Sequence, residues 1–267
     1  MAPTYLGREP GIERSDGQRG SALLVFVMAG LVPAIHVFTF AGSEDLDARH
    51  RQANRRRSSN GYGPGVTEQS LNATPQQTQD VKAQLRREAL ARRDALPAEA
   101  RKAAAETIAS RAFPLVIAPG AIVSGFMPLK SEINPLPLMR KLADAGAKLA
   151  LPVAAGRGKP LIMRAWAWGE PLVPGVWGIR APPPQAPEAE PDILLVPLLA
   201  FDRAGHRIGY GAGYYDLTIT RLRAKKPVAA VGLAFAIQEI TAVPPTRFDA
   251  RLDLVLTESE TIDLRNA

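Results

Sequence analysis

The segment Arg207–Asp216, written RIGYGAGYYD, gathers more chemistry-bearing residues than any other part of this 267-residue chain. Glycines stand at the alternate positions Gly209, Gly211 and Gly213. Alternate glycines allow the backbone to adopt positive φ angles and to bring its N–H groups close to a ligand. The arginine before them and the Tyr-Tyr-Asp after them add a cation, aromatic surface and a carboxylate. This combination predicts a phosphate-binding loop beside a metal ligand.

Two common phosphate-binding loops do not fit this segment. Its glycine spacing is GxGxG instead of GxGxxG, and the residues about 20 positions further on, 228–232, contain no acidic side chain that could bind a ribose. A Walker-type loop needs Gly-Lys-Ser/Thr, which the chain lacks, and residues 156–159 (GRGK) precede a proline and indicate a turn. A glycine-rich connection with two core tyrosines is the structural alternative.

The composition limits the chemistry. The chain has no cysteine, which excludes disulfides and thiolate nucleophiles, and its three histidines do not favour a histidine-rich metal site. Any metal is therefore expected to be a hard cation such as Mg²⁺, held by carboxylates and phosphate oxygens. The net charge of +7 favours an anionic partner such as a nucleotide. Nucleic acid is not expected, because no basic run is interleaved with aromatic side chains that could stack on bases.

The first part of the chain, residues 1–79, differs from the rest. It is polar apart from a hydrophobic run at 21–42, whose length suits a membrane span of about 20 apolar residues. A proline, a histidine and two glycines interrupt that run. We expect residues 1–79 to be a poorly ordered, dispensable extension, which a start near Val66 or Leu71 through a non-AUG codon would remove. A membrane-associated segment is the alternative.

The remainder, residues 80–267, alternates helical and buried-strand patterns. This order predicts a single catalytic α/β domain with three layers, in which a mostly parallel sheet carries helices on both faces. The expected helices are 80–96, 98–112, 135–146 and 214–224. The expected strands are 121–127, 148–153, 161–168, 192–202, 227–235 and 252–257, with a proline-rich irregular segment at 175–191. The glycine loop follows a strand and precedes a helix, which predicts a ligand site at the carboxyl edge of the sheet.

The first expected helix is amphipathic, with Asp80 as its N-cap. Val81, Leu85 and Leu96 lie near one face of it. Lys82 and Arg86 are four residues apart and project from the same side, and the other basic residues include Arg87, Arg92 and Arg93. The basic side chains form either a solvated face or, for Lys82 and Arg86, a clamp on a polyphosphate.

Several segments together resemble one known family. FDRAGHRIGYGAGYYD at 201–216 resembles the signature of the 5-formyltetrahydrofolate cyclo-ligases, also called 5,10-methenyltetrahydrofolate synthetases. The Lys82–Arg86 pair, Glu132 in FMPLKSEIN, and the pattern from Phe235 to residue 258 agree with it at the right separations. The resemblance covers about 80–260. Three positions depart from the family pattern: Phe248 stands where histidine is common, Ala181 where glutamate is common, and Ala212 in the glycine ladder.

The resemblance implies an ATP- and Mg²⁺-dependent ring closure of 5-formyltetrahydrofolate to 5,10-methenyltetrahydrofolate, with ADP and phosphate released. It implies catalytic roles for Arg207 and Tyr214, and metal ligation by Asp216 and Asp249, with Asp253 as the substitute for Asp249. The implied nucleotide contacts are Lys82, Arg86, Arg207, Ile208, Gly209, Tyr210, Gly211, Ala212, Gly213, Tyr214 and Tyr215. The implied folate contacts are Met127, Glu132, Tyr210, Gly211, Ala212, Gly213 and Tyr214, with Trp177 as a further packing surface.

Two alternatives remain at this point: an ATP-dependent enzyme of similar fold that acts on another carbonyl substrate, and a non-enzymatic protein that binds nucleotides or anions. For the catalytic domain we expect a cytoplasmic location, no membrane contact, and a monomer or weak dimer. His206 is the only histidine in residues 80–267, but it does not match the family pattern and receives no role.

Overall fold

The structure is a computed structural model that describes residues 74–265. The predictions for the hydrophobic run at 21–42 and for most of the expected extension lie outside these residues. Within the described part of the chain, no helix is both long enough and apolar enough to cross a membrane.

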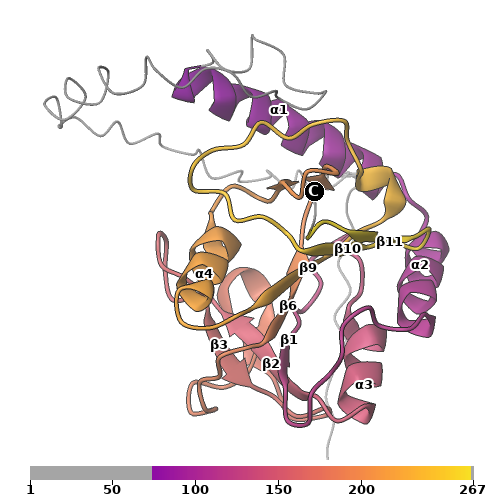
Figure 1. Cartoon of the computed structure of the whole chain (residues 1–267), viewed down its shortest axis with the longest axis vertical. Helices are drawn as coiled ribbons and strands as arrows, with labels where there is room; N and C mark the ends of the chain where they lie inside the picture. Colours follow the sequence, from indigo (N-terminus) through magenta and orange to yellow (C-terminus); the bar gives the residue numbers. More distant parts are fainter. Residues whose placement is uncertain (1–73, 266–267) are drawn as a thin grey trace, which may run out of the picture. The chain divides into compact units, whose positions relative to one another are not determined.

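A seven-stranded sheet forms the centre of the described domain (Figure 1). Its strands follow the order β11 (Thr261–Asp263), β10 (Leu254–Leu256), β9 (Ala229–Leu233), β6 (Ile193–Pro197), β1 (Ile122–Ser124), β2 (Lys148–Val153) and β3 (Ile162–Ala165). The five central strands are parallel, and only the two edge strands, β3 and β11, run antiparallel to their neighbours. The predicted mostly parallel sheet is confirmed.

Helices cover both faces of the sheet because its central strands are apolar on both sides. In β6, Ile193 and Leu195 belong to one hydrophobic cluster, and Leu194 and Val196 belong to the other, as the alternation of side chains along a strand requires. The first cluster contains α2 (Ala98–Ser110) and α3 (Leu136–Asp144), and the second contains α4 (Tyr214–Arg223). The three-layer α/β/α prediction is therefore confirmed (Figure 1).

The long helix α1 (Pro75–Asp94) packs outside these layers, against a hairpin of β7 (Ala200–Phe201) and β8 (Arg207–Ile208). It begins earlier than predicted: Thr74 is the N-cap, and its hydroxyl and the Gln77 side chain form a capping box. Asp80 was therefore the wrong cap. The sequence Thr-Pro-Gln-Gln supplies both the cap and a proline in the first turn, where a missing N–H is harmless.

The predicted inward face of α1 was wrong at Val81, whereas Leu85 and Leu96 pack against the hydrophobic clusters as expected. Val81 is 49% exposed, whereas Lys82 is 5% exposed and Arg93 is completely buried. The inward face of the helix carries Lys82, Ala89 and Arg93, at spacings of seven and four residues. The buried face of α1 is therefore partly cationic.

The strand predicted at 192–202 is two strands. It breaks after Pro197, where the carbonyls of Leu198 and Leu199 accept hydrogen bonds from the buried Gln238 amide instead of from a neighbouring strand. Gln238 belongs to the short helix η4 (Ala236–Gln238). The break redirects the chain into the β7–β8 hairpin, and this hairpin delivers the glycine loop.

Two edge features were not predicted. β3 is antiparallel because only residues 154–161 separate it from β2, which is too short for a crossover. The other edge strand is β11, which forms a hairpin with β10 and which the sequence patterns missed.

The proline-rich segment contains a small hairpin of β4 (Val173–Pro174) and β5 (Arg180–Ala181), joined through the 3-10 turn η3 (Val176–Gly178).

Candidate functional site

A cavity of about 780 Å³ lies at the carboxyl ends of β1, β2 and β6. Its wall includes Phe126 and Met127 after β1, Val153 at the end of β2, and Pro197 at the end of β6. This volume is typical of a site for a small-molecule ligand. All fifteen residues predicted for the site line it: Lys82, Arg86, Met127, Glu132, Arg207, Ile208, Gly209, Tyr210, Gly211, Ala212, Gly213, Tyr214, Tyr215, Asp216 and Asp249. The structure brings them together; their individual roles stay predictions.

The glycine loop forms one wall of the cavity, between β8 and α4. Gly211 and Gly213 adopt positive φ angles of 97° and 68°, whereas Gly209 does not. The Arg86 guanidinium lies beside Gly211, at ordinary contact distance from the position that a Cβ would take there. Gly213 is the N-cap of α4 and provides no side-chain cap, so the first N–H groups of this helix remain available to an anion.

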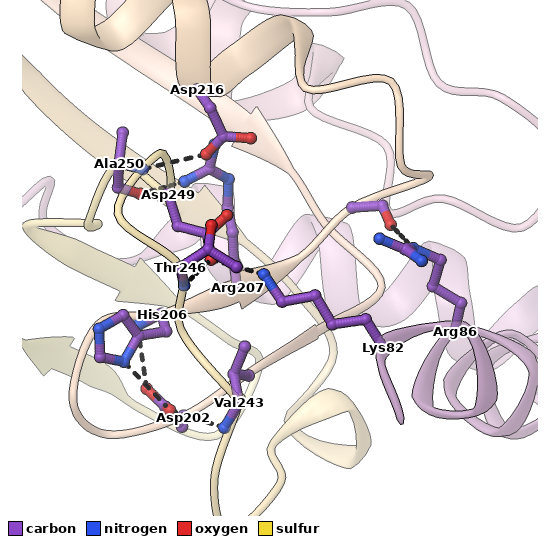
Figure 2. Close-up of polar contacts among 11 residues, drawn as sticks. Lys82, Arg86, Asp202, His206, Arg207, Asp216, Val243, Thr246, Asp249 and Ala250 are labelled. Atoms are coloured by element: carbon purple, nitrogen blue, oxygen red, sulfur yellow. Dashed lines mark hydrogen bonds and ion pairs between the residues drawn. The ribbon is translucent and has the colours of Figure 1, made fainter. Parts of the chain in front are cut away.

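Helix α1 contributes two cations to the cavity beside the glycine loop. The Lys82 ammonium donates a hydrogen bond of 2.5 Å to Asp249 Oδ2, and Arg86 Nε donates to the Gly209 carbonyl at 2.9 Å (Figure 2). Burial lowers the pKa of Arg86, and the nearby Asp249 carboxylate opposes this shift. Both cations therefore point inward, which excludes the solvated-face interpretation for this pair.

Two hydrogen bonds fix the Asp249 carboxylate, one from Lys82 and one from the Thr246 backbone. Its Oδ2 accepts the bond from the Thr246 N–H at 2.8 Å. Burial raises the pKa of the Asp249 carboxyl, but the hydrogen bonds from Lys82 and Thr246 outweigh burial and bring the pKa below its ordinary value. Asp249 is consequently an anion at neutral pH.

Arg207 and Asp216 form a second pair beside the first. The Arg207 side chain is 4% exposed, and one guanidinium nitrogen donates to Asp216 Oδ1 at 2.7 Å while the other donates to the Ala250 carbonyl. The Ala250 N–H also donates to Asp216 Oδ1, at 3.0 Å. Figure 2 shows how these contacts tie the start of α4 to the loop that carries Asp249. Asp216 Oδ2 has no hydrogen-bond partner among the described residues.

The structure separates the two candidates for the second carboxylate. Asp249 lines the cavity, but Asp253 does not. Asp253 lies at the amino-terminal ends of β9 and β10, where it accepts hydrogen bonds from Arg223 and from the Ala230 N–H. Asp253 is therefore not a substitute for Asp249.

The carboxylate pair suits a hard cation that also binds phosphate. Among the described residues no group of three His, Cys, Asp or Glu side chains could enclose a metal, and the aspartates that line the cavity are Asp216 and Asp249. Mg²⁺ commonly takes one or two carboxylates and fills its other positions with phosphate oxygens and water. Asp216 and Asp249 fit that donor set.

Glu132 lies on another wall, in a turn after β1. Its Oε2 accepts a 2.8 Å hydrogen bond from the Leu129 N–H. Burial raises the pKa of the Glu132 carboxyl above its ordinary value, although the Leu129 N–H, Arg93 and Tyr210 oppose the shift. A partly desolvated acceptor of this kind is typical of a site that recognises N–H groups of a ligand.

Arg93 was missed as a site residue, although it stands directly behind this wall. It donates to Ser131 Oγ at 3.0 Å and to the Tyr210 hydroxyl at 2.7 Å. It follows Lys82 by eleven residues and Arg86 by seven, a helical spacing that places all three on one side of α1. That spacing was the available signal; the hydrophobic pattern pointed to a different face.

Aromatic side chains border the cavity. Trp177 packs edge-on against Tyr214, with ring centroids 5.9 Å apart, although the indole is 64% exposed. Its backbone adopts a φ of 58°, which is unusual for a bulky residue. Phe248, also in the wall, is 71% exposed beside Asp249. Both rings provide apolar surface that a planar ligand could cover.

His206 does not line the cavity. Its ring nitrogen lies 3.4 Å from Asp202 Oδ2, and the Asp202 carboxylate accepts hydrogen bonds from the N–H groups of Ala204, His206 and Val243. Figure 2 shows this cluster apart from the Lys82–Asp249 contact. Asp202 organises the β7–β8 turn, so His206 has structural partners only.

The fold and the site together define an α/β protein with a glycine-lined cavity at the carboxyl edge of its sheet. Two salt bridges, Lys82–Asp249 and Arg207–Asp216, border this cavity. The chain belongs to the 5-formyltetrahydrofolate cyclo-ligase family, whose model matches residues 78–258. It is 38% identical over 160 residues to the 5-formyltetrahydrofolate cyclo-ligase of Mycolicibacterium smegmatis, covering 56% of this chain and 80% of the relative.

Two further comparisons agree. The 5-formyltetrahydrofolate cyclo-ligase of Escherichia coli K12 is 31% identical over 178 residues, which cover 63% of this chain and 96% of the relative. The solved structure of Aquifex aeolicus 5,10-methenyltetrahydrofolate synthetase has a TM-score of 0.59 at 28% identity, covering 70% of this chain and 94% of that one. The protein is accordingly an enzyme, a ligase of folate metabolism, and the non-enzymatic alternative is set aside.

Proposed function

We propose that the protein converts 5-formyltetrahydrofolate to 5,10-methenyltetrahydrofolate in an ATP- and Mg²⁺-dependent reaction. The observation that carries the proposal is the shared cavity. It joins a glycine loop and two salt bridges to a partly buried glutamate and aromatic surface. One end suits a polyphosphate and the other a planar, nitrogen-rich ring, so that two substrates can meet between them.

The polyphosphate belongs at the end formed by α1 and the glycine loop. Among the described residues the Lys82 ammonium makes one hydrogen bond, so its other two donors can bind phosphate oxygens. Arg86 Nε donates to Gly209, and within residues 74–265 its terminal nitrogens make no hydrogen bond and can bind phosphate in the same way. The N–H groups of the glycine loop and the first turn of α4 add further donors.

Arg207 contributes mainly through position in this proposal. Its guanidinium is engaged by Asp216 and by the Ala250 carbonyl. It thereby fixes the two loops that carry the aspartates and adds positive charge behind the phosphates. Phosphoryl transfer depends on such positioning and charge neutralisation more than on covalent chemistry by the protein.

Asp216 and Asp249 would hold the Mg²⁺ ion, which supplies charge neutralisation at the transferring phosphoryl group when bound. Asp216 offers its Oδ2, which accepts no hydrogen bond from the part of the chain that the structure describes. The Asp249 carboxylate forms a salt bridge with Lys82, and its lowered pKa keeps it ionised.

The folate belongs at the other end, where Glu132 accepts hydrogen bonds from the amino and ring N–H groups of the pterin. Met127 and Tyr210 line this part of the wall. Tyr214 contacts the formyl-bearing ring, and Trp177, which packs against Tyr214, covers the ligand from the cavity entrance.

The chemistry requires no protein nucleophile. The formyl oxygen attacks the γ-phosphorus of ATP and ADP leaves; the neighbouring folate N–H nitrogen then attacks the activated carbon, its proton is lost to solvent or to the phosphate, and phosphate departs. An amide-like oxygen is a poor leaving group, and phosphorylation converts it into a good one. A chain without cysteine can perform this reaction.

The test is direct. Purified protein is incubated with 5-formyltetrahydrofolate, ATP and Mg²⁺, and methenyl formation is followed by its absorbance together with ADP release. We expect one ADP for each methenyl product, and no product without ATP or in excess EDTA. Product formation without ATP consumption, or ATP hydrolysis without methenyl product, would contradict the proposal.

A further inference from the structure

Arg93 is a completely buried cation without a carboxylate partner among the described residues. Its donors reach three neutral acceptors: Ser131 Oγ, the Tyr210 hydroxyl, and, at the longer distance of 3.4 Å, the Leu198 carbonyl. Burying an arginine against neutral partners is unfavourable compared with exposing it to water. Simple packing does not account for this arrangement, because an apolar side chain would fill the same position more favourably.

The three acceptors belong to three separate segments: Tyr210 lines the cavity, and Ser131 and Leu198 are next in sequence to residues that do. Ser131 immediately precedes Glu132 in the turn after β1, and Tyr210 is part of the glycine loop. The carbonyl of Leu198 lies at the break between β6 and β7, where Gln238 also binds it. Arg93 itself does not line the cavity. Arg93 therefore links the turn that carries Glu132 to the glycine loop, from the side that faces away from the cavity.

The turn that carries Glu132 needs such support. Lys130 adopts a φ of 54°, a left-handed conformation that is unfavourable for a residue with a Cβ. The turn is closed by the Glu132–Leu129 hydrogen bond on the cavity side and by Ser131 on the Arg93 side, where Ser131 in turn donates to Asp94. Removing the Arg93 contact leaves Glu132 with the Leu129 backbone hydrogen bond and with a Tyr210 hydroxyl that has lost its own hydrogen bond from Arg93.

We propose that Arg93 is a positioning residue that holds Glu132 and Tyr210 in their relative places and so determines the affinity for the folate substrate. This inference rests on the proposed function. Its second consequence is electrostatic: the Arg93 charge lowers the pKa of Glu132, in opposition to burial. The Arg93 guanidinium thus affects both the position and the ionisation of Glu132, the proposed pterin acceptor.

Arg93→Lys and Arg93→Gln test the two parts. Lysine keeps the charge but cannot reach three acceptors with a planar fork, and glutamine removes the charge as well. For both variants we expect the KM for 5-formyltetrahydrofolate to rise about tenfold or more, the loss typical of a charged hydrogen bond, while the KM for ATP changes less than about twofold. In Arg93→Gln, the acid limb of kcat/KM for folate should also move to higher pH, because Glu132 loses a stabilising charge.

Arg111→Lys is the matched structural control. Arg111 also links two segments that are distant in sequence, because its guanidinium donates to the carbonyls of Thr257 and Glu258. It does not line the ligand cavity. This variant should lower the Tm without changing either KM. Circular dichroism and thermal melts identify the folded fraction of every variant, and kinetic constants are normalised to it.

Three outcomes overturn the inference: an unchanged folate KM in folded Arg93 variants, an equal rise in both KM values, or an Arg93→Gln acid limb identical to that of wild type. A double variant with Tyr210→Phe gives a further check, since the two losses should not add if Arg93 acts through Tyr210. A wild-type enzyme without methenyl formation would overturn the proposed function and this inference together. An active wild type with unaffected Arg93 variants would overturn the inference alone.

Discussion

The two ends of the cavity use charge differently. At the end between α1 and the glycine loop, each anion is paired directly with a cation, Asp249 with Lys82 and Asp216 with Arg207. At the Glu132 wall, no cation of residues 74–265 forms a salt bridge with Glu132; its contacts are the Leu129 N–H and the Tyr210 hydroxyl, and Arg93 acts on it only at longer range. As a result, the pKa of Asp249 is lowered and that of Glu132 is raised.

This difference matches two kinds of ligand. A polyphosphate with its metal brings opposite charges, so paired side chains with unused donors and acceptors can exchange part of their contacts for it. A neutral ring brings N–H groups whose hydrogen bonds are strongest when the acceptor is shielded from water. Variants at the two ends should therefore affect different substrates.

The largest effect is expected for Asp216→Asn. Asparagine keeps the oxygen that accepts from Arg207 and Ala250, so the fold should persist, but the negative charge needed for Mg²⁺ is lost. We expect kcat to fall on the order of 10²–10³-fold, as for the loss of one electrostatic contact in an active site. Steady-state kinetics across a Mg²⁺ titration measure it. Wild-type turnover in the variant would exclude Asp216 as the metal ligand.

Glu132→Ala should act on the folate end. Loss of a charged acceptor corresponds to about 1.5–3 kcal/mol, or roughly a 10- to 100-fold rise in folate KM, with little change in ATP KM. The matched control is Glu170→Ala. Glu170 accepts a 2.8 Å hydrogen bond from the N–H three residues before it, as Glu132 does, but it lies outside the cavity wall. The control should leave both KM values unchanged; a larger effect on ATP than on folate in Glu132→Ala would reverse our assignment of the two ends.

A smaller effect should appear in the pH dependence. Burial raises the pKa of Glu132, so on acidification this acceptor is protonated at a higher pH than an ordinary glutamate. The Asp249 pKa is shifted down, so the Lys82–Asp249 pair persists to lower pH. On acidification, kcat/KM for folate should therefore decline at a higher pH than kcat/KM for ATP, each measured with the other substrate saturating. Coincident acid limbs would contradict the comparison.

The sequence patterns predicted the sheet and the glycine loop well for a physical reason. Strands buried on both faces appear as continuous apolar runs, such as DILLV at 192–196, and parallel strands deliver their following loops to one edge. The loop after that run was therefore placed correctly at the carboxyl edge. Only its path was wrong, because the break after Pro197 depends on the Gln238 side chain, about forty residues further along the chain.

The orientation of α1 was not predictable in this way. Its inward cations are stabilised by distant acceptors: Lys82 by Asp249, which is 167 residues away, and Arg93 by the Tyr210 hydroxyl, which is 117 residues away. A local hydrophobic pattern contains no information about such partners, so it placed Val81, which is 49% exposed, on the inward face and did not place Lys82 and Arg93 there. For the same reason the sequence left Asp249 and Asp253 undecided.

Asp253→Asn should produce the smallest change, and it sharpens the role of Asp216. The two aspartates have nearly the same exposure, 27% and 29%, and each accepts from one arginine and one backbone N–H. Asp253, however, holds the end of α4 to β9 outside the cavity. Its loss should lower the free energy of unfolding by about 1 kcal/mol, or Tm by about 2–4 °C, without changing kinetics. If Asp253→Asn instead lost turnover as Asp216→Asn does, contact pattern and not position in the cavity would determine function.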